Sequence, residues 1–211
     1  MSGPEEREIK LSAGEGFVLP DLHDLAGKVG DSGIESLETV YWDTAQLDVA
    51  RRDFGLRHRR RCDHPEDPGV WTLKTPGHDD GDRLVRGEHE LPAPGAAPPP
   101  ALLALLPAEV DSSALHPVAV LRADRRVLTV TGSDGAAVEV MDDTVSILAA
   151  DGSVADRFRE LEVEVMEGGD PLADRVAARL REAGAGPPET SSKYRRALRV
   201  LGHPLAGIAA P

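Results

Sequence analysis

Aromatic side chains are scarce in this sequence, and their scarcity limits what the protein can recognise. Phe, Trp and Tyr together make up 3% of the 211 residues. A core must therefore be built from Val, Leu, Ile and Ala, and few side chains are available to stack on a nucleotide base. There is also a single cysteine, Cys62. It excludes an intramolecular disulfide and favours a reducing, cytoplasmic environment.

Long apolar runs and an excess of positive charge are missing as well. No stretch approaches the roughly 20 apolar residues that a membrane-spanning helix needs, and the N-terminus lacks the order of a signal peptide, so we expect no membrane partner. The formal net charge of −13 argues against nucleic-acid binding, which requires a basic face. Six arginines nevertheless fall between positions 51 and 61. A local cation site in an acidic protein would suit a small polyanion that binds together with metal ions.

Charged and apolar residues alternate in several segments, which is the pattern of β-strands with one polar face. Glu6, Glu8 and Lys10 share one face near the N-terminus, and the same alternation recurs in residues 84–91 (LVRGEHEL) and 157–167 (RFRELEVEVME). One such strand would indicate a solvated edge. Several of them predict an α+β fold in which a β-barrel has a polar interior and helices cover its apolar outside.

Turn signals divide the chain into nine predicted strands. These lie near residues 5–12, 35–43, 54–61, 70–75, 83–91, 118–131, 136–141, 144–149 and 157–166. The proline-rich run 92–100 cannot continue a sheet and leads into a short predicted helix over 101–106, and a longer amphipathic helix is predicted over 171–183. We expect one domain over residues 1–200, followed by a tail or linker over 201–211.

The charged strand faces supply the candidate site. Clustered carboxylates without His or Cys at ligand spacing favour hard cations such as Mg²⁺ or Mn²⁺, whereas Arg and Lys suit phosphate oxygens. The acidic candidates are Glu6, Glu8, Glu88, Glu90, Glu139, Asp143, Glu162 and Glu164, and the basic ones are Lys10, Arg57, Arg59, Lys74, Arg86, Arg122, Arg126 and Lys193. Arg125 and Arg126 compete for one position, and the shared parity with Arg122 favours Arg126. Burying so many charges would be costly, so the pattern predicts a wet cavity for metal and polyphosphate.

Seven motifs, in order along the chain, resemble those of the CYTH domain, or triphosphate tunnel metalloenzyme, family. The first is the Glu-x-Glu-x-Lys signature at Glu6, Glu8 and Lys10. The others are the segment 40–61 with Arg57 and Arg59, WTLKTPG with Lys74, RGEHE with Glu88 and Glu90, VEVMDD, LEVEVMEGG with Glu162 and Glu164, and SSKYRRAL with Lys193. The resemblance covers roughly residues 5 to 200.

This resemblance implies an eight-stranded antiparallel tunnel that binds a triphosphate end-on through its basic residues. It implies that glutamates of the first and last strands hold one or two divalent ions, with Glu6, Glu8, Glu139, Asp143, Glu162 and Glu164 as the candidate ligands. It also implies that the carboxylate wall helps to position or deprotonate the attacking water. The candidate catalytic residues are Glu6, Glu8, Lys10, Glu88 and Glu90.

Three functions are compatible with this resemblance. The leading one is metal-dependent hydrolysis of inorganic triphosphate or a related triphosphate compound. A class IV-type adenylate cyclase would use the same metals and cations, but the ribose oxygen would attack the α-phosphorus. A non-catalytic module that binds polyphosphate is the third function, and the linker-like C-terminus would suit a CHAD domain that follows in the native protein.

Overall fold

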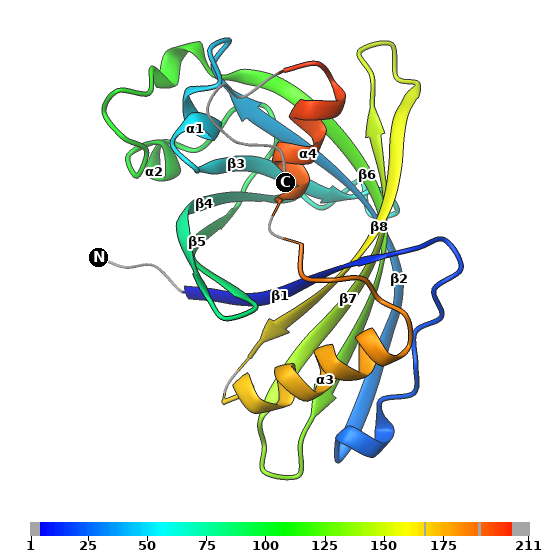
Figure 1. Cartoon of the computed structure of the whole chain (residues 1–211). Helices are drawn as coiled ribbons and strands as arrows, with labels where there is room; N and C mark the ends of the chain where they lie inside the picture. Colours follow the sequence, from blue (N-terminus) through cyan, green and yellow to red (C-terminus); the bar gives the residue numbers. More distant parts are fainter. Residues whose placement is uncertain (1–4, 167, 190, 204–211) are drawn as a thin grey trace.

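The centre of the fold is a closed barrel of eight antiparallel strands in the computed structural model, which describes residues 5–166, 168–189 and 191–203 (Figure 1). The strands are β1 (Glu5–Ala13), β2 (Lys28–Asp43), β3 (Gly55–Arg61), β4 (Val70–Asp80), β5 (Arg83–Pro92), β6 (His116–Thr131), β7 (Ala137–Leu148) and β8 (Val154–Val165). Around the barrel they follow the order β1-β5-β4-β3-β2-β6-β7-β8. The predicted eight-stranded antiparallel barrel is confirmed.

The two strands predicted at 136–141 and 144–149 form one continuous strand, β7, so the prediction of a break between them is wrong. Asp142 and Asp143, which lie between the two predicted strands, stay in register with β6 and β8. Each carboxylate is bound by an arginine of a neighbouring strand: Asp142 by Arg159 and Asp143 by Arg125. These cross-strand ion pairs hold charged residues in the middle of the strand.

Helices cover both the outside of the barrel and one of its ends. They are α1 (Asp48–Arg51), α2 (Pro100–Leu103), α3 (Asp170–Glu182) and α4 (Lys193–Val200), with short 3-10 turns η1 (His23–Leu25) and η2 (Ser112–Ala114). The predicted amphipathic helix corresponds to α3 within one residue at each end. Among the described residues, none of the helices has the length and apolar character needed to cross a bilayer. The predicted tail over 201–211 lies mostly outside the described residues.

The long helix α3 buries one apolar stripe against the outer face of the barrel. Leu172, Val176 and Leu180 of the helix pack with Ile9 of β1 and Leu161 of β8 in the largest core cluster. All of these side chains are at most 1% exposed. Burial of a leucine or valine side chain contributes about 1.5–3 kcal/mol, so this contact fixes β1 against β8. It thereby sets the inward direction of the alternating residues of both strands.

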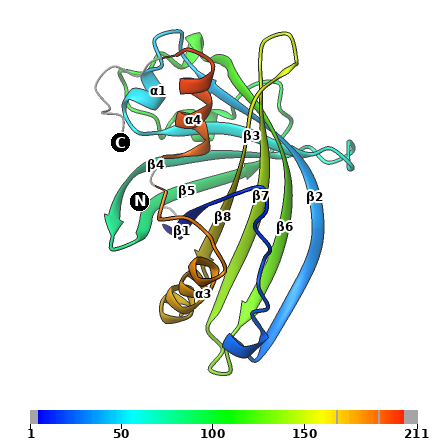
Figure 2. The ribbon, with the colours of Figure 1, turned by 45° about the vertical axis from the view of Figure 1, so that its right-hand side comes forward.

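The last helix, α4, packs on residues of the inner face instead. Its Tyr194 and Leu198 contact Leu121, Val145 and Phe158 of three adjacent strands. Because strand residues alternate between faces, Val145 shares the inner face with Asp143, two residues earlier. The interior is therefore polar along only part of its length, and α4 fills the apolar end. Figures 1 and 2 show α4 beside α1 at one end of the barrel and α3 toward the other.

Candidate functional site

A cavity of about 1450 Å³ occupies the polar part of the barrel. Alternation along the strands directs basic and acidic side chains into it, and α4 adds one more cation. The lining cations include Lys10, Arg57, Arg59, Lys74, Arg86, Arg125 and Lys193, and the lining carboxylates include Glu6, Glu88, Glu90, Glu162 and Glu164. The structure thus collects charged residues of both signs from seven elements that are distant in sequence.

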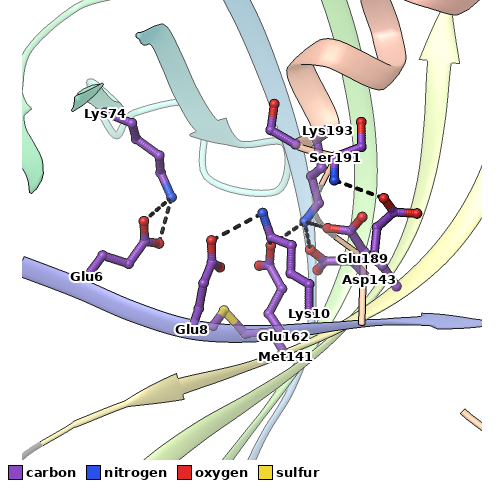
Figure 3. A network of polar contacts seen from close by, with 12 residues as sticks. Glu6, Glu8, Lys10, Lys74, Met141, Asp143, Glu162, Glu189, Ser191 and Lys193 are labelled. Carbon is purple, nitrogen blue, oxygen red and sulfur yellow. Dashed lines mark hydrogen bonds and ion pairs between the residues drawn. The ribbon is translucent and has the colours of Figure 1, made fainter. Parts of the chain in front are cut away.

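Glu6 of β1 is held by two cations, of which Figure 3 shows Lys74. The Nζ of Lys74 donates to both of its carboxylate oxygens at 2.6 and 2.8 Å, and the Nε of Arg86 donates to one of them at 3.0 Å. Arg86 also donates to Glu8 at 3.0 Å. Burial would raise the pKa of Glu6, but the charges of Lys74 and Arg86 outweigh it and lower that pKa to about 2. Glu6 is therefore a carboxylate at neutral pH and a poor proton acceptor.

Three buried carboxylates of β7 and β8 surround the ammonium of Lys193, and Figure 3 labels two of them, Asp143 and Glu162. Its Nζ lies 3.0 Å from Asp143 and 2.9 Å from Glu162, and it also contacts Glu160. Arg125 of β6 donates to both oxygens of Asp143 at 2.7 and 2.5 Å and to Glu162 at 3.0 Å. Burial opposes a charged ammonium here, but the three carboxylates raise the pKa of Lys193.

These contacts set the charge states of the three carboxyl groups. Burial would raise the pKa of Asp143, yet Lys193 and Arg125 lower it to about 2. The pKa of Glu162 also lies well below its usual value, because Lys193, Lys10 and Arg125 outweigh its burial. At Glu160 burial dominates and the pKa is raised. The cluster is therefore mainly ionised and is held together by its cations.

At the β3 wall of the cavity, formed by Arg57 and Arg59, carboxylates neutralise far less of the positive charge. Arg57 reaches Glu88 at 3.5 Å, and its buried Nε has no hydrogen-bond partner among the described residues. Arg59 donates to the hydroxyl of Thr39 at 3.4 Å. Burial and the charges of Arg57 and Arg125 lower the pKa of Arg59 to about 9. A half-buried guanidinium that is repelled by two neighbours would be stabilised by an anion.

Glu164 of β8 has the opposite character. Within the described part of the chain, no salt bridge or hydrogen bond neutralises its half-buried side chain. Burial, Glu6 and Glu88 raise the pKa of Glu164 to about 7. It can therefore gain or lose a proton near neutral pH, unlike the ion-paired Glu6.

A family model for the CYTH domain matches residues 5–197 of the chain. This chain belongs to the CYTH domain family. Two curated relatives come from Mycobacterium tuberculosis: the uncharacterised proteins Rv2226 of strain H37Rv and MT2285 of strain CDC 1551. Each is 32% identical to this CYTH domain over 210 residues, which is 92% of this chain and 40% of the relative. The chain therefore spans less than half the length of the curated relatives it matches.

Solved structures share the fold of this CYTH domain. The proposed adenylyl cyclase HpAC1 of Hippeastrum, described with a dominant triphosphatase activity, has a TM-score of 0.59 at 19% identity and covers 90% of this chain and 95% of its own. A proposed adenylate cyclase of Bacillus halodurans gives 0.59 at 18% identity with the same coverage. PH1819 of Pyrococcus horikoshii gives 0.55 at 19% identity, over 92% of this chain and 98% of its own. At these identities the likeness shows the fold alone.

Two predicted phosphate ligands of this CYTH domain point away from the cavity, and that expectation is wrong. Arg122 is paired with Glu38 at 3.2 Å, Arg126 is paired with Asp31 at 2.6 Å, and their side chains are 63% and 45% exposed. Parity shows that these two arginines share a face, but it does not show which face. Arg125 is the arginine of β6 that enters the cavity. The signal for it was Asp143, its direct partner in the register with β7.

The remaining candidates lie at different distances from the cation clusters. Glu8 is buried, 3.1 Å from Lys10, and does not line the cavity directly. Glu90 is exposed and accepts a hydrogen bond from Thr72 at 3.2 Å. Glu139 is half-buried and in register with Glu164, outside the set of lining residues. The structure therefore places Glu90 and Glu139 at the edge of the predicted site.

One member of the cluster, Glu160, was left without a role by the sequence. It is 4% exposed and contacts Lys193. Its parity with Glu162 and Glu164 indicated an inward direction, but its distance from the Glu-x-Glu pair made a surface position equally acceptable. The contact with Lys193 explains why Glu160 points inward, because the docking of α4 brings a cation to this carboxylate. That contact is long-range and leaves no local trace in the sequence.

The chemistry of Asp143, Glu160 and Glu162 fits a hard divalent cation. One oxygen of each lies within 4.8 Å of the other two, and all three residues are buried. Carboxylate oxygens are the ligands that Mg²⁺ and Mn²⁺ prefer. The ammonium of Lys193 lies among the same oxygens, which shows that this space accepts a cation.

Proposed function

We propose that this CYTH domain hydrolyses a triphosphate compound, with inorganic triphosphate as the leading substrate and Mg²⁺ or Mn²⁺ as the cofactor. The observation that carries the proposal is the β3 wall. Both side chains line the cavity: the buried Arg57 has an Nε without a hydrogen-bond partner among the described residues, and the half-buried Arg59 is repelled by two arginines. A polyanion supplies the missing negative charge, and guanidinium groups bind phosphate oxygens in a bidentate manner.

The residues of the cavity have separable roles in this proposal. Arg57 and Arg59 bind the terminal phosphate oxygens, Lys74 of the neighbouring strand β4 adds a cation beside them, and Lys193 of α4 adds another. Together they stabilise the negative charge that grows on the leaving oxygen. A divalent ion held by the carboxylates would neutralise the transferring phosphoryl group and orient an attacking water.

Proton transfer is assigned to a residue different from those that the sequence suggested. Glu6 and Glu8 are held by lysine and arginine side chains, and the low pKa of Glu6 makes it a weak base. Glu164 lines the same cavity, and its pKa is raised to about 7. A general base is most effective when its pKa lies near the working pH. We therefore assign to Glu164 the removal of a proton from the attacking water.

The test is phosphate release from tripolyphosphate with Mg²⁺ or Mn²⁺, with ATP and pyrophosphate in parallel. Rapid release from tripolyphosphate supports the proposal if Glu6→Gln and Glu162→Gln each lower the rate at least about a hundredfold. Arg126→Met is the matched control, because it removes an exposed cation outside the barrel.

Two other outcomes would redirect the proposal. Cyclic AMP and pyrophosphate formed from ATP, with no release from tripolyphosphate, would identify a cyclase. Tight binding of tripolyphosphate with no release from any substrate would identify a polyphosphate-binding module.

A further inference from the structure

A lysine and the expected metal ion compete for the same oxygens. The Nζ of Lys193 lies 3.0 Å from Asp143 and 2.9 Å from Glu162 and contacts Glu160. Oxygens of these same three residues lie within 4.8 Å of one another and form the candidate ligand set for a divalent ion. An ammonium and a metal ion cannot both occupy the centre of this set.

We propose that Lys193 is a tethered competitor of the divalent ion, displaced from the carboxylates when its ammonium moves to a phosphate oxygen of the bound polyanion. The inference rests on the proposed function. It adds that metal and polyphosphate bind with positive coupling. The polyphosphate draws the ammonium of Lys193 away from the carboxylates that bind the metal, and the metal occupies the carboxylates that would otherwise hold this ammonium.

The anchoring of α4 allows this exchange without movement of the helix. Ser192 caps its N-terminus by accepting the N–H of Arg195 at 3.2 Å. The hydroxyl of Tyr194 donates to the buried Asp43 at 2.7 Å, and its ring stacks on Tyr41 with centroids 4.6 Å apart. These contacts hold the backbone on both sides of Lys193. Its flexible four-carbon side chain can then change partners while its Cα stays in place.

The same exchange applies to most cations of the cavity. Lys74 is held by Glu6, Arg86 by Glu6 and Glu8, and Arg125 by Asp143. A bare polyanion that recruits these cations leaves carboxylates buried without partners, which is strongly unfavourable. A divalent ion that binds those carboxylates removes this cost. The favourable event is therefore the joint binding of metal and polyanion, and by linkage each ligand increases the affinity for the other by the same factor.

A substitution at Lys193 distinguishes competition with the metal ion from a purely structural role of this lysine. Lys193→Met removes the ammonium and keeps an unbranched side chain. We expect the variant to bind Mn²⁺ about tenfold more tightly than the wild type in the absence of phosphate compounds, a factor typical of coupled sites. It should bind imidotriphosphate, a hydrolysis-resistant analogue, about tenfold more weakly. The two affinities then change in opposite directions, whereas a structural defect would weaken both.

The measurement is a titration of the protein with Mn²⁺, in which the electron paramagnetic resonance signal reports the free ion. Lys193→Arg, which retains the charge, should not tighten Mn²⁺ binding. Arg126→Met controls for the loss of a cation outside the cavity and should bind Mn²⁺ as the wild type does. Unchanged or weaker Mn²⁺ binding by Lys193→Met overturns the inference.

Thermal unfolding provides a second readout if Lys193→Met is unstable. Loss of the ammonium leaves Asp143, Glu160 and Glu162 with less positive charge nearby, so the Tm should fall and Mn²⁺ should restore it. The rise in Tm on addition of Mn²⁺ should exceed that of the wild type, and an equal or smaller rise contradicts the inference. If the variant does not fold even with Mn²⁺, the inference is tested on the wild type, by the effect of imidotriphosphate on its Mn²⁺ affinity. Imidotriphosphate must then tighten its Mn²⁺ binding at least about tenfold beyond the analogue's own chelation.

Failure of this inference can be told apart from failure of the proposed function. Phosphate release from tripolyphosphate by the wild type, with no gain in Mn²⁺ affinity in Lys193→Met, rejects only the competition. If the wild type neither binds imidotriphosphate nor releases phosphate from tripolyphosphate, both proposals fall.

Discussion

Two walls of one cavity handle the same kind of charge in opposite ways. On the wall formed by β1, β4, β5, β6, β8 and α4, Lys193 and the lining cations of the strands each contact at least one carboxylate at short range, as Lys74 does with Glu6. On the β3 wall, Arg59 has, within the part of the chain that the structure describes, a hydroxyl as its hydrogen-bond partner and two arginines as repelling neighbours. The first wall is stable without a ligand, whereas the second holds a charge that favours one. Paired charges keep the barrel closed, and unpaired charges give it affinity for an anion.

The strongest test of this contrast is Arg59→Met. Loss of a phosphate-binding guanidinium should lower kcat/KM for tripolyphosphate about tenfold to a hundredfold. The free energy of unfolding should stay the same or rise, because Arg59 is destabilised by burial and by repulsion from Arg57 and Arg125. Steady-state kinetics and denaturant unfolding measure the two effects. A clear loss of stability would show that Arg59 is compensated as fully as the cations of the other wall.

A second test uses pH. The pKa of Glu164 is raised to about 7 in the folded protein from an ordinary value of 4.5, so the folded state binds more protons than the unfolded state between these values. Its contribution to stability is therefore present at low pH and is lost as pH rises from about 4.5 to 7. Glu164→Gln should raise the Tm of the metal-free protein at pH 8 and change it little at pH 4. Equal shifts at both values would contradict the raised pKa.

The smallest expected effect is that of Arg122→Ala on the outside of the barrel. The exposed pair with Glu38 should contribute less than about 1 kcal/mol, because exposed ion pairs are screened by solvent. Phosphate release from tripolyphosphate should be that of the wild type. A large loss of activity would show that Arg122 acts in the site after all, as its place in the sequence pattern suggested.

The barrel and most of its site were predictable because strand alternation is a local property. The alternation over five residues is enough to show that Glu6, Glu8 and Lys10 share one face of a strand. The errors arose where the outcome depended on a partner strand or helix. β7 is continuous because arginines of β6 and β8 bind its acidic pair, and Arg125 enters the cavity because it faces Asp143.

The position of α4 was also beyond local reasoning. Its apolar residues match the apolar end of the inner face, which is recognisable only after the strands have been assembled. The same docking makes Glu160 part of the site through its contact with Lys193. Periodicity in the sequence identified the charged faces, and the packing of the last helix determined which charges meet.

The placement of α4 has a consequence for how the protein matures. A nascent chain that ends before residue 193 can form every strand of the barrel, yet it leaves Leu121, Val145 and Phe158 without their apolar cover. Exposed surface of this kind makes incomplete chains prone to aggregation. Lys193 arrives with the same helix. Synthesis of α4 therefore supplies the apolar cover of these residues and the ammonium of Lys193 together, so that we expect a barrel without α4 to be both inactive and prone to aggregation.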